Sequence, residues 1–215
     1  MKFSENTILV LKNFSGINPS VMFRKGNVLR TISPQKTVMA QANIPDEIEG
    51  DAAVYDLSRF LSTLTLFDDP DVTFGNEKFT ISSGRRKVGY TYASENMIVS
   101  PPNKEIELPS IDVSVKAEWN DIDSVRRAAG VLQVSDIAFV GKNGKISLCA
   151  KDVSNPTSDS YDVEIADYEG ADFNMHIKVD NFKLIPADYE ISLSSRGMAH
   201  FKSEMIQYWI AVQSN

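Results

Sequence analysis

The chain has 215 residues, of which 42% are hydrophobic, and a formal net charge of −7. Its length allows one large domain or two domains of about 100 residues, and its hydrophobic fraction excludes an intrinsically disordered chain. The single cysteine, Cys149, excludes an internal disulfide framework and fits a reducing cytosol. The short apolar run near the N-terminus is broken by Lys12 and Asn13, so we expect neither a signal peptide nor a membrane span.

The charge is unevenly distributed along the chain. Residues 1–100 contain 11 basic and 11 acidic residues, whereas residues 101–215 contain 11 and 18 and so account for the whole excess. An acidic chain is not expected to wrap nucleic acid with its whole surface. A local basic lining remains compatible with this composition.

The first half begins with a predicted helix at 4–14, for which Ser4 is a suitable N-cap. A hairpin pattern follows at 21–32 and 37–44. The stretch AVYDLSRFLSTLTLF then predicts a short strand and a helix, with Asp56 near its cap. Strands are predicted at 71–75, 78–83 and 87–93, separated by glycine and charged turns.

The second half repeats this order of elements. A strand at 113–117 precedes a helix at 120–132, which we expect Asn120 to cap. Asn143-Gly144 is a strong signal for a two-residue hairpin turn within 135–153. The remaining prediction is a strand at 160–168, a strand with one helical turn at 173–185 that ends before Pro186, and strands at 188–195, 198–205 and 207–213.

The shared order predicts two similar modules, 1–100 and 112–215, joined by an extended, proline-rich connector at 101–111. The predicted fold class is α+β, with antiparallel sheets and two helices in each module. Residue identities do not repeat, so the duplication depends on element order alone.

Each predicted helix carries a basic residue away from its apolar stripe. In DIDSVRRAAGVL, the stripe of Ile122, Val125, Ala128 and Ala129 leaves Arg127 about 170° from its centre. Lys12 and Arg59 are placed in a similar way, and Arg126 lies about 90° from its stripe. The helical turn at 180–185 is too short to have a clear face, and its one basic residue is Lys183. These basic residues either complement helix dipoles and keep the surface soluble or line a shared surface for a polyanion.

The chemistry of an enzyme is not indicated. Cys149 alternates inside a strand pattern, and the two histidines, His176 and His200, lie in strand patterns without a base motif. Cysteine and histidine do not recur at metal-ligand spacing. We therefore predict a protein that is not an enzyme and uses no cofactor.

Four stretches together resemble the sliding clamps of tailed bacteriophages, which are DNA polymerase processivity factors. They are MKFSENTILVLKNFSGINPSVMFRKG, AVYDLSRFL, RRAAGVLQVSDIAFVGKNGKI and ADYEGADFNMHIKVDNFKLIPADYEISLSSRGMAHFKSEMIQYWIAV. The family is similar in plan to the proliferating cell nuclear antigen and to bacterial beta clamps. The resemblance covers nearly the whole chain.

This resemblance implies a homotrimeric ring of six modules, with helices lining the hole and sheets forming the outer wall. Such a ring would encircle double-stranded DNA without reading its sequence and would tether the replicative DNA polymerase. It would be loaded by an ATP-dependent clamp loader in the cytoplasm of the infected bacterial host.

The resemblance also implies roles for particular residues. Edge strands would pair between neighbouring subunits through Val88, Tyr90, Tyr92, Tyr161, Val163 and Ile165. A hydrophobic pocket for partner peptides would be lined by Ile44, Pro45, Met97, Ile98, Trp209 and Ile210.

One alternative shares most of these features. A non-enzymatic, β-rich structural or assembly protein that associates edge to edge would have the same strands and acidity, but would not need helices with outward-facing bases. A DNA-binding regulator that reads sequence would instead need a recognition helix rich in Arg, Asn and Gln, and DSVRRAAGVL is too sparse for that role.

Overall fold

The computed structural model describes residues 1–102, 104, 106–155 and 157–214. The chain divides into two compact units, Met1–Asn103 and Lys104–Asn215. The division falls inside the predicted connector, of which residues 103 and 105 lie outside the described residues. We call residues 1–103 the first unit and residues 104–215 the second unit.

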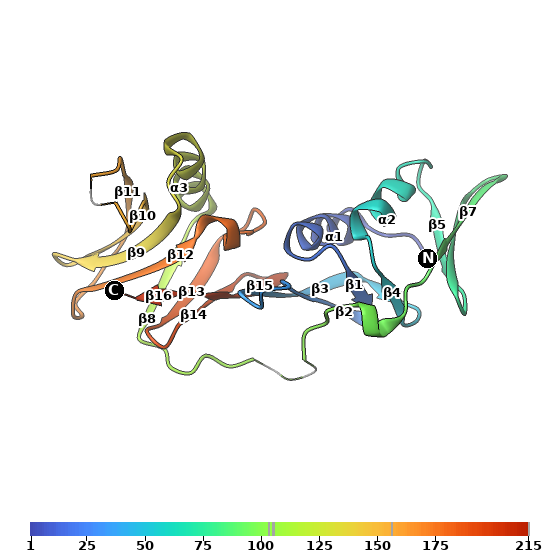
Figure 1. Ribbon diagram of the computed structural model, residues 1–215, viewed down its shortest axis with the longest axis horizontal. Coiled ribbons are helices and arrows are strands. Elements are labelled where there is room, and N and C mark those ends of the chain that lie inside the picture. Colours follow the sequence, from blue (N-terminus) through green and yellow to red (C-terminus); the bar gives the residue numbers. More distant parts are fainter. Residues whose placement is uncertain (103, 105, 156, 215) are drawn as a thin grey trace. The chain divides into compact units, whose positions relative to one another are not determined.

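The first unit places two helices on one side of a strand pair. β2 runs antiparallel to β3, and Figure 1 shows α1 and α2 on the same side of these two strands. A second pair is β1-β4, and a separate sheet has the order β5-β6-β7. The elements are α1 (Glu5–Ile17), β1 (Val21–Phe23), β2 (Gly26–Ile32), β3 (Val38–Ile48), β4 (Ala52–Val54), α2 (Leu57–Leu64), β5 (Asp71–Phe74), β6 (Lys78–Ser83), β7 (Arg86–Thr91) and the 3-10 helix η1 (Glu95–Met97).

Both helices of the first unit begin at the predicted caps. The Ser4 side chain accepts a hydrogen bond from the Thr7 amide at 3.3 Å, and the Asp56 carboxylate accepts one from the Arg59 amide at 2.8 Å. Each bond satisfies an amide that has no partner inside the helix. The cap predictions for both helices are therefore confirmed.

The core of the first unit is built around aromatic rings. Phe60 and Phe79 lie 4.9 Å apart between ring centroids, and Phe23 lies 5.9 Å and 5.8 Å from them. All three side chains are fully buried. This cluster joins β1, α2 and β6, because one ring comes from each of these elements.

The second unit contains two antiparallel sheets. One has the order β11-β10-β9-β12-β16, and β15, β14, β13 and β8 pair in that order in the other. Helix α3 packs on β9, β10 and β11. The elements are β8 (Val113–Ala117), α3 (Trp119–Leu132), β9 (Asp136–Lys142), β10 (Lys145–Lys151), β11 (Tyr161–Asp167), β12 (Phe173–Lys178), the 3-10 helix η2 (Val179–Asn181), β13 (Tyr189–Ser194), β14 (Met198–Lys202), β15 (Ile206–Ala211) and β16 (Gln213–Ser214).

Two local predictions for the second unit are wrong. Helix α3 begins after Glu118, so Asn120 lies inside it, and the Trp119 amide is capped at 2.8 Å by the Asp188 carboxylate from the segment before β13. The predicted helical turn at 180–185 shrinks to η2. Phe182, Leu184 and Ile185 are all buried, which a non-helical path after η2 permits. Among the described residues, the second unit thus has one α-helix where two were expected.

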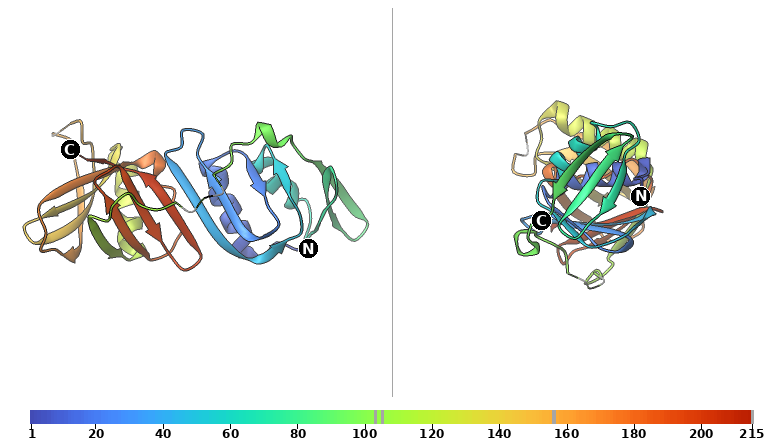
Figure 2. Two further views of the ribbon diagram at one scale, coloured as in Figure 1. Left: turned by 90° about the horizontal axis from the view of Figure 1, so that it is seen from below. Right: turned by 90° about the vertical axis from the view of Figure 1, so that its right-hand side faces the viewer.

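The predicted hairpin turn of the second unit is confirmed. Asn143 and Gly144 both have positive φ, at 53° and 80°, between β9 and β10. Two consecutive residues with positive φ suit the twist of a two-residue hairpin. Figure 2 gives two further views of the strands of each unit.

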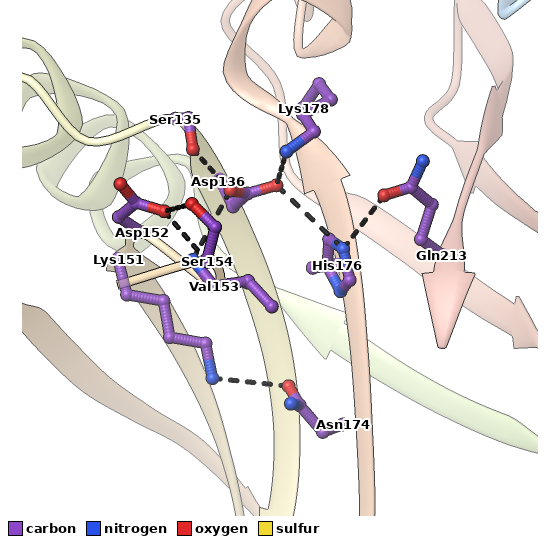
Figure 3. Close-up of polar contacts among 10 residues, drawn as sticks. All are labelled: Ser135, Asp136, Lys151, Asp152, Val153, Ser154, Asn174, His176, Lys178 and Gln213. Atoms are coloured by element: carbon purple, nitrogen blue, oxygen red, sulfur yellow. Dashed lines mark hydrogen bonds and ion pairs between the residues drawn. The ribbon is translucent and has the colours of Figure 1, made fainter. Parts of the chain in front are cut away.

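A buried carboxylate holds the start of β9. Asp136 is 0% exposed, accepts a hydrogen bond from the Ser135 hydroxyl at 2.5 Å and forms an ion pair with Lys178 at 2.8 Å (Figure 3). His176 lies 3.9 Å from the same carboxylate, and its Nε2 bonds the Gln213 side chain of β16 at 3.1 Å. These contacts tie β9, β12 and β16 together.

The contacts of Asp136 lower the pKa of its carboxyl. Burial acts to raise the pKa, but the bonds from Lys178 and Ser135 oppose it and leave the pKa below its ordinary value. A group with a lowered folded-state pKa stabilises the fold above its unfolded pKa. That contribution is lost as the pH falls through the folded pKa.

We expect Asp136→Asn to lower the free energy of unfolding by about 1–3 kcal/mol at neutral pH, because Lys178 and the buried polar groups lose their carboxylate. The difference from the unsubstituted protein should shrink as the pH falls from the unfolded-state pKa of about 3.9 toward the lower folded-state pKa of Asp136. Urea unfolding at several pH values measures this. Asp172→Asn, at an exposed site, is the control, and a pH-independent difference would contradict the electrostatic role of Asp136.

Candidate nucleic-acid interface

Helix α1 presents Lys12 to solvent. Thr7, Val10, Leu11, Phe14 and Ile17 are the buried residues of α1, and they form one stripe along the helix. Helix α1 packs on β2 and β3 through this stripe, so the opposite side is left to water. Lys12 is exposed there, as predicted.

Helix α2 presents Arg59 in the same way. Its buried residues are Leu57, Phe60, Leu61 and Leu64, which form one apolar stripe. Arg59 is exposed. Helices α1 and α2 pack against each other, so the two basic residues come from adjacent helices of the first unit.

Helix α3 presents two arginines. Ile122, Val125 and Ala129 are buried as predicted, while Ala128 is only half-buried. The side chains of Arg126 and Arg127 are 48% and 70% exposed. The arginines therefore lie off the packed face of the helix, as its amphipathic pattern predicts.

Asp123 pairs with both arginines. Its carboxylate accepts bonds from Arg126 at 2.5 Å and 3.2 Å, and its other oxygen lies 3.0 Å from Nε of Arg127. The hydrogen bond from Arg126 holds the pKa of the Asp123 carboxyl below its ordinary value. This acid was not predicted as part of the site, although its i,i+3 and i,i+4 spacing to the arginines is a readable signal.

Lys183 differs from the other basic residues. It is exposed, but it follows η2 and does not lie on a helix. The prediction that a fourth helix would carry it is wrong for the reason given above. The position of a residue on a helix therefore gives no argument for placing Lys183 in the predicted DNA-binding lining.

The predicted interface strands both lie at sheet edges. β7 is the outer strand of β5-β6-β7, and β11 is the outer strand of the five-stranded sheet. Val88, Val163 and Ile165 are half-buried and Tyr161 is 39% exposed. Tyr90 and Tyr92 also serve the first unit itself, since their hydroxyls donate to the carbonyls of Asp56 and Gly75.

The predicted pocket residues fall into two groups. Pro45 and Met97 are exposed, the latter by 58%. Ile44, Ile98, Trp209 and Ile210 are buried. The Trp209 indole stacks on His200 with ring centroids 4.9 Å apart.

Cys149 and the two histidines have contacts typical of structural residues. Cys149 is buried, and burial is the main cause that raises the pKa of its thiol to about 12. His176 bonds Gln213, and His200 bonds Gln207 at 2.9 Å. No group of three His, Cys, Asp or Glu suited to a metal ion occurs within the part of the chain that the structure describes.

Two family models together cover almost the whole chain. Residues 3–100 match the model described as DNA polymerase processivity factor, and residues 112–214 match the model described as gp45 sliding clamp, C terminal. The sliding clamp of Escherichia phage RB69 is 33% identical to the chain over 223 residues, covering 100% of this chain and 98% of its own length. The chain belongs to the sliding clamp family.

Other comparisons agree with this assignment. The sliding clamp of Enterobacteria phage T4 is 31% identical, with 100% of this chain and 98% of that protein covered. The proliferating cellular nuclear antigen of Entamoeba histolytica has the same fold, with a TM-score of 0.72 at 12% identity over 99% of this chain and 97% of that chain. The beta subunit of DNA polymerase III from Pseudomonas aeruginosa gives a TM-score of 0.64 at 10% identity over 95% of this chain and 61% of that chain.

The family decides between the two functions left open by the sequence. The protein is a sliding clamp, a DNA polymerase processivity factor, and the alternative of a β-rich assembly protein is set aside. DNA polymerase is therefore its partner. Across its described residues, the clamp contains no helix long and apolar enough to cross a membrane.

We expect Asp123→Asn to increase the affinity of the clamp for duplex DNA, because both arginines lose the carboxylate that neutralises them. The slope of log K against log salt should steepen by up to about 0.9, the value for one additional phosphate contact. Fluorescence anisotropy with a short labelled duplex at several salt concentrations measures this. Asp180→Asn, at an exposed position in η2, is the control, and an unchanged slope would show that Asp123 does not restrain the arginines.

Proposed function

We propose that three copies of this clamp close into a ring around double-stranded DNA. Each copy would contribute two units, giving six around the hole, with α1, α2 and α3 facing the duplex. The observation that carries this proposal is that each α-helix buries its apolar face against its own unit and leaves a basic residue exposed: Lys12, Arg59, Arg126 and Arg127. Lys183 is retained in the proposed lining as an exposed base outside a helix.

The proposed contact with DNA is weak and independent of sequence. Lysine and arginine attract phosphates without reading bases. A closed ring is held on DNA by topology, so it needs only enough attraction to keep the duplex centred. The excess of acid in residues 101–215 would discourage DNA from binding elsewhere on the clamp.

The proposed subunit contact joins β7 of one copy to β11 of the next. Both strands have an unpaired edge among the described residues. An open edge exposes amide and carbonyl groups that favour pairing with another strand. Val88, Tyr90 and Tyr92 would then meet Tyr161, Val163 and Ile165, and repeating this contact by threefold symmetry would close the ring.

The replicative polymerase would hold the clamp through a short hydrophobic peptide, and of the residues expected to receive it Pro45 and Met97 are the exposed ones. Met97 is exposed and unbranched, which suits a surface that accepts several peptides. An ATP-dependent clamp loader would open the ring. These events would take place in the cytoplasm of the infected bacterial host.

We expect the clamp, its cognate loader and ATP to give a complex that persists on nicked circular DNA and runs off linear DNA. Arg126→Glu with Arg127→Glu should reduce retention on circles about tenfold, because attraction becomes repulsion. Filtration of labelled clamp with each template measures this, and Lys142→Glu, at the exposed end of β9, is the control. Equal loss from circles and linear DNA would contradict encirclement.

We expect Val88→Asp and Val163→Asp each to convert a trimer into monomers at micromolar concentration, because each places a charge at a proposed edge contact. Sedimentation velocity measures the assembly state. Val131→Asp is the matched control, since Val131 is 81% exposed on α3 and lies on no sheet edge. Trimers that survive both edge substitutions would rule out this pairing.

A further inference from the structure

A pocket in the first unit lies on the side of β2 that faces away from α1. Its volume is about 430 Å³. Successive strand residues point to opposite faces, and Leu29 and Thr31 are buried on the side where α1 packs. Val28 and Arg30 alternate with them and line the pocket. Figure 1 shows the chain after η1 passing on this same side of β2.

The charged residues that line this pocket are all basic. They are Arg24, Lys25 and Arg30, with no carboxylate among the lining residues. Arg24 is already fixed, because its guanidinium bonds Asp51 at 2.6 Å and Glu95 at 3.2 Å. These two carboxylates neutralise Arg24, so the positive charge of the pocket that has no acidic partner comes from Lys25 and Arg30.

Lys25 and Arg30 have no such partner. Neither forms an ion pair with a described residue, and Nε of Arg30 is buried without a hydrogen bond. An unsatisfied buried donor costs about 1–3 kcal/mol, and native structures contain few of them. A bound acceptor that lets the Arg30 side chain reorient would remove this cost.

Apart from these three bases and Ser100, the lining is apolar. Met22, Val28, Pro101 and Pro102 contribute hydrocarbon surface, and the proline rings fix the backbone φ of their segment. No aromatic ring lines the pocket on which a nucleobase could stack. Carboxylates with aliphatic side chains between them match this combination better than a nucleic acid does.

We propose that this pocket binds an acidic, aliphatic peptide segment of a partner protein, with carboxylates at Lys25 and Arg30 and apolar side chains against Met22 and Pro101. None of the residues predicted to hold the polymerase peptide lines it. The proposal goes beyond the proposed function, because the ring contacts and the DNA lining use other residues. It depends only on the first unit.

The test uses the full-length clamp and a fluorescein-labelled decapeptide of alternating aspartate and leucine. Anisotropy titration at low salt should show saturable binding with one peptide per chain. The same peptide with asparagine in place of aspartate should bind at least about tenfold more weakly, since it lacks the charges. Lys25→Met and Arg30→Met should each weaken binding at least about fivefold.

Arg85→Met is the matched control, because it removes one exposed positive charge from the turn between β6 and β7. It should bind the aspartate peptide as the unsubstituted clamp does. Lys25 is exposed, so Lys25→Met decides the outcome if Arg30→Met does not fold. The proposal is overturned if the asparagine peptide binds equally well, if Lys25→Met has no effect, or if a ten-nucleotide single-stranded DNA displaces the peptide.

Discussion

The attachment of each helix to its sheet by an apolar stripe is the constraint on which the rest of this clamp depends. In α1 and α2 the buried residues recur every three or four positions, so the helix can pack in only one rotation. Burying those side chains is worth roughly 1.5–3 kcal/mol each, far more than any exposed charge contributes. The positions of Lys12 and Arg59 therefore follow from packing.

The strength of the proposed DNA contact depends on the ion pairs that the basic residues form as well as on where those residues lie. Asp123 occupies both arginines of α3 from within the same helix. Exposed pairs of this kind contribute little stability, yet they lower the positive charge that a phosphate would meet. A processivity factor that must move along DNA gains from such moderation, because a stronger contact would slow sliding.

The sheets provide the outer strands that the proposed subunit contact uses. β7 is one outer strand of β5-β6-β7 and β11 is one outer strand of the five-stranded sheet, so each of these two strands has an edge without a partner strand within the described residues. In the second unit, Asp136 fixes the opposite part of the five-stranded sheet by linking β9 to β12, and His176 connects that strand to β16. These side-chain bonds reinforce the backbone pairing of β9, β12 and β16.

The sequence by itself determined the α+β class, the helix faces, the caps at Ser4 and Asp56 and the turn at Asn143-Gly144, because each depends on residues close together in the chain. It could not determine the cap of α3, since Asp188 lies 69 positions from Trp119, nor the shortening of the turn that precedes Lys183, which burial of Phe182 and Leu184 accompanies. The sequence also could not predict the basic pocket beside β2, because Arg30 and Pro101 line the same pocket only in the folded chain. Tertiary structure decided these features, because contacts between distant segments outweigh local preference.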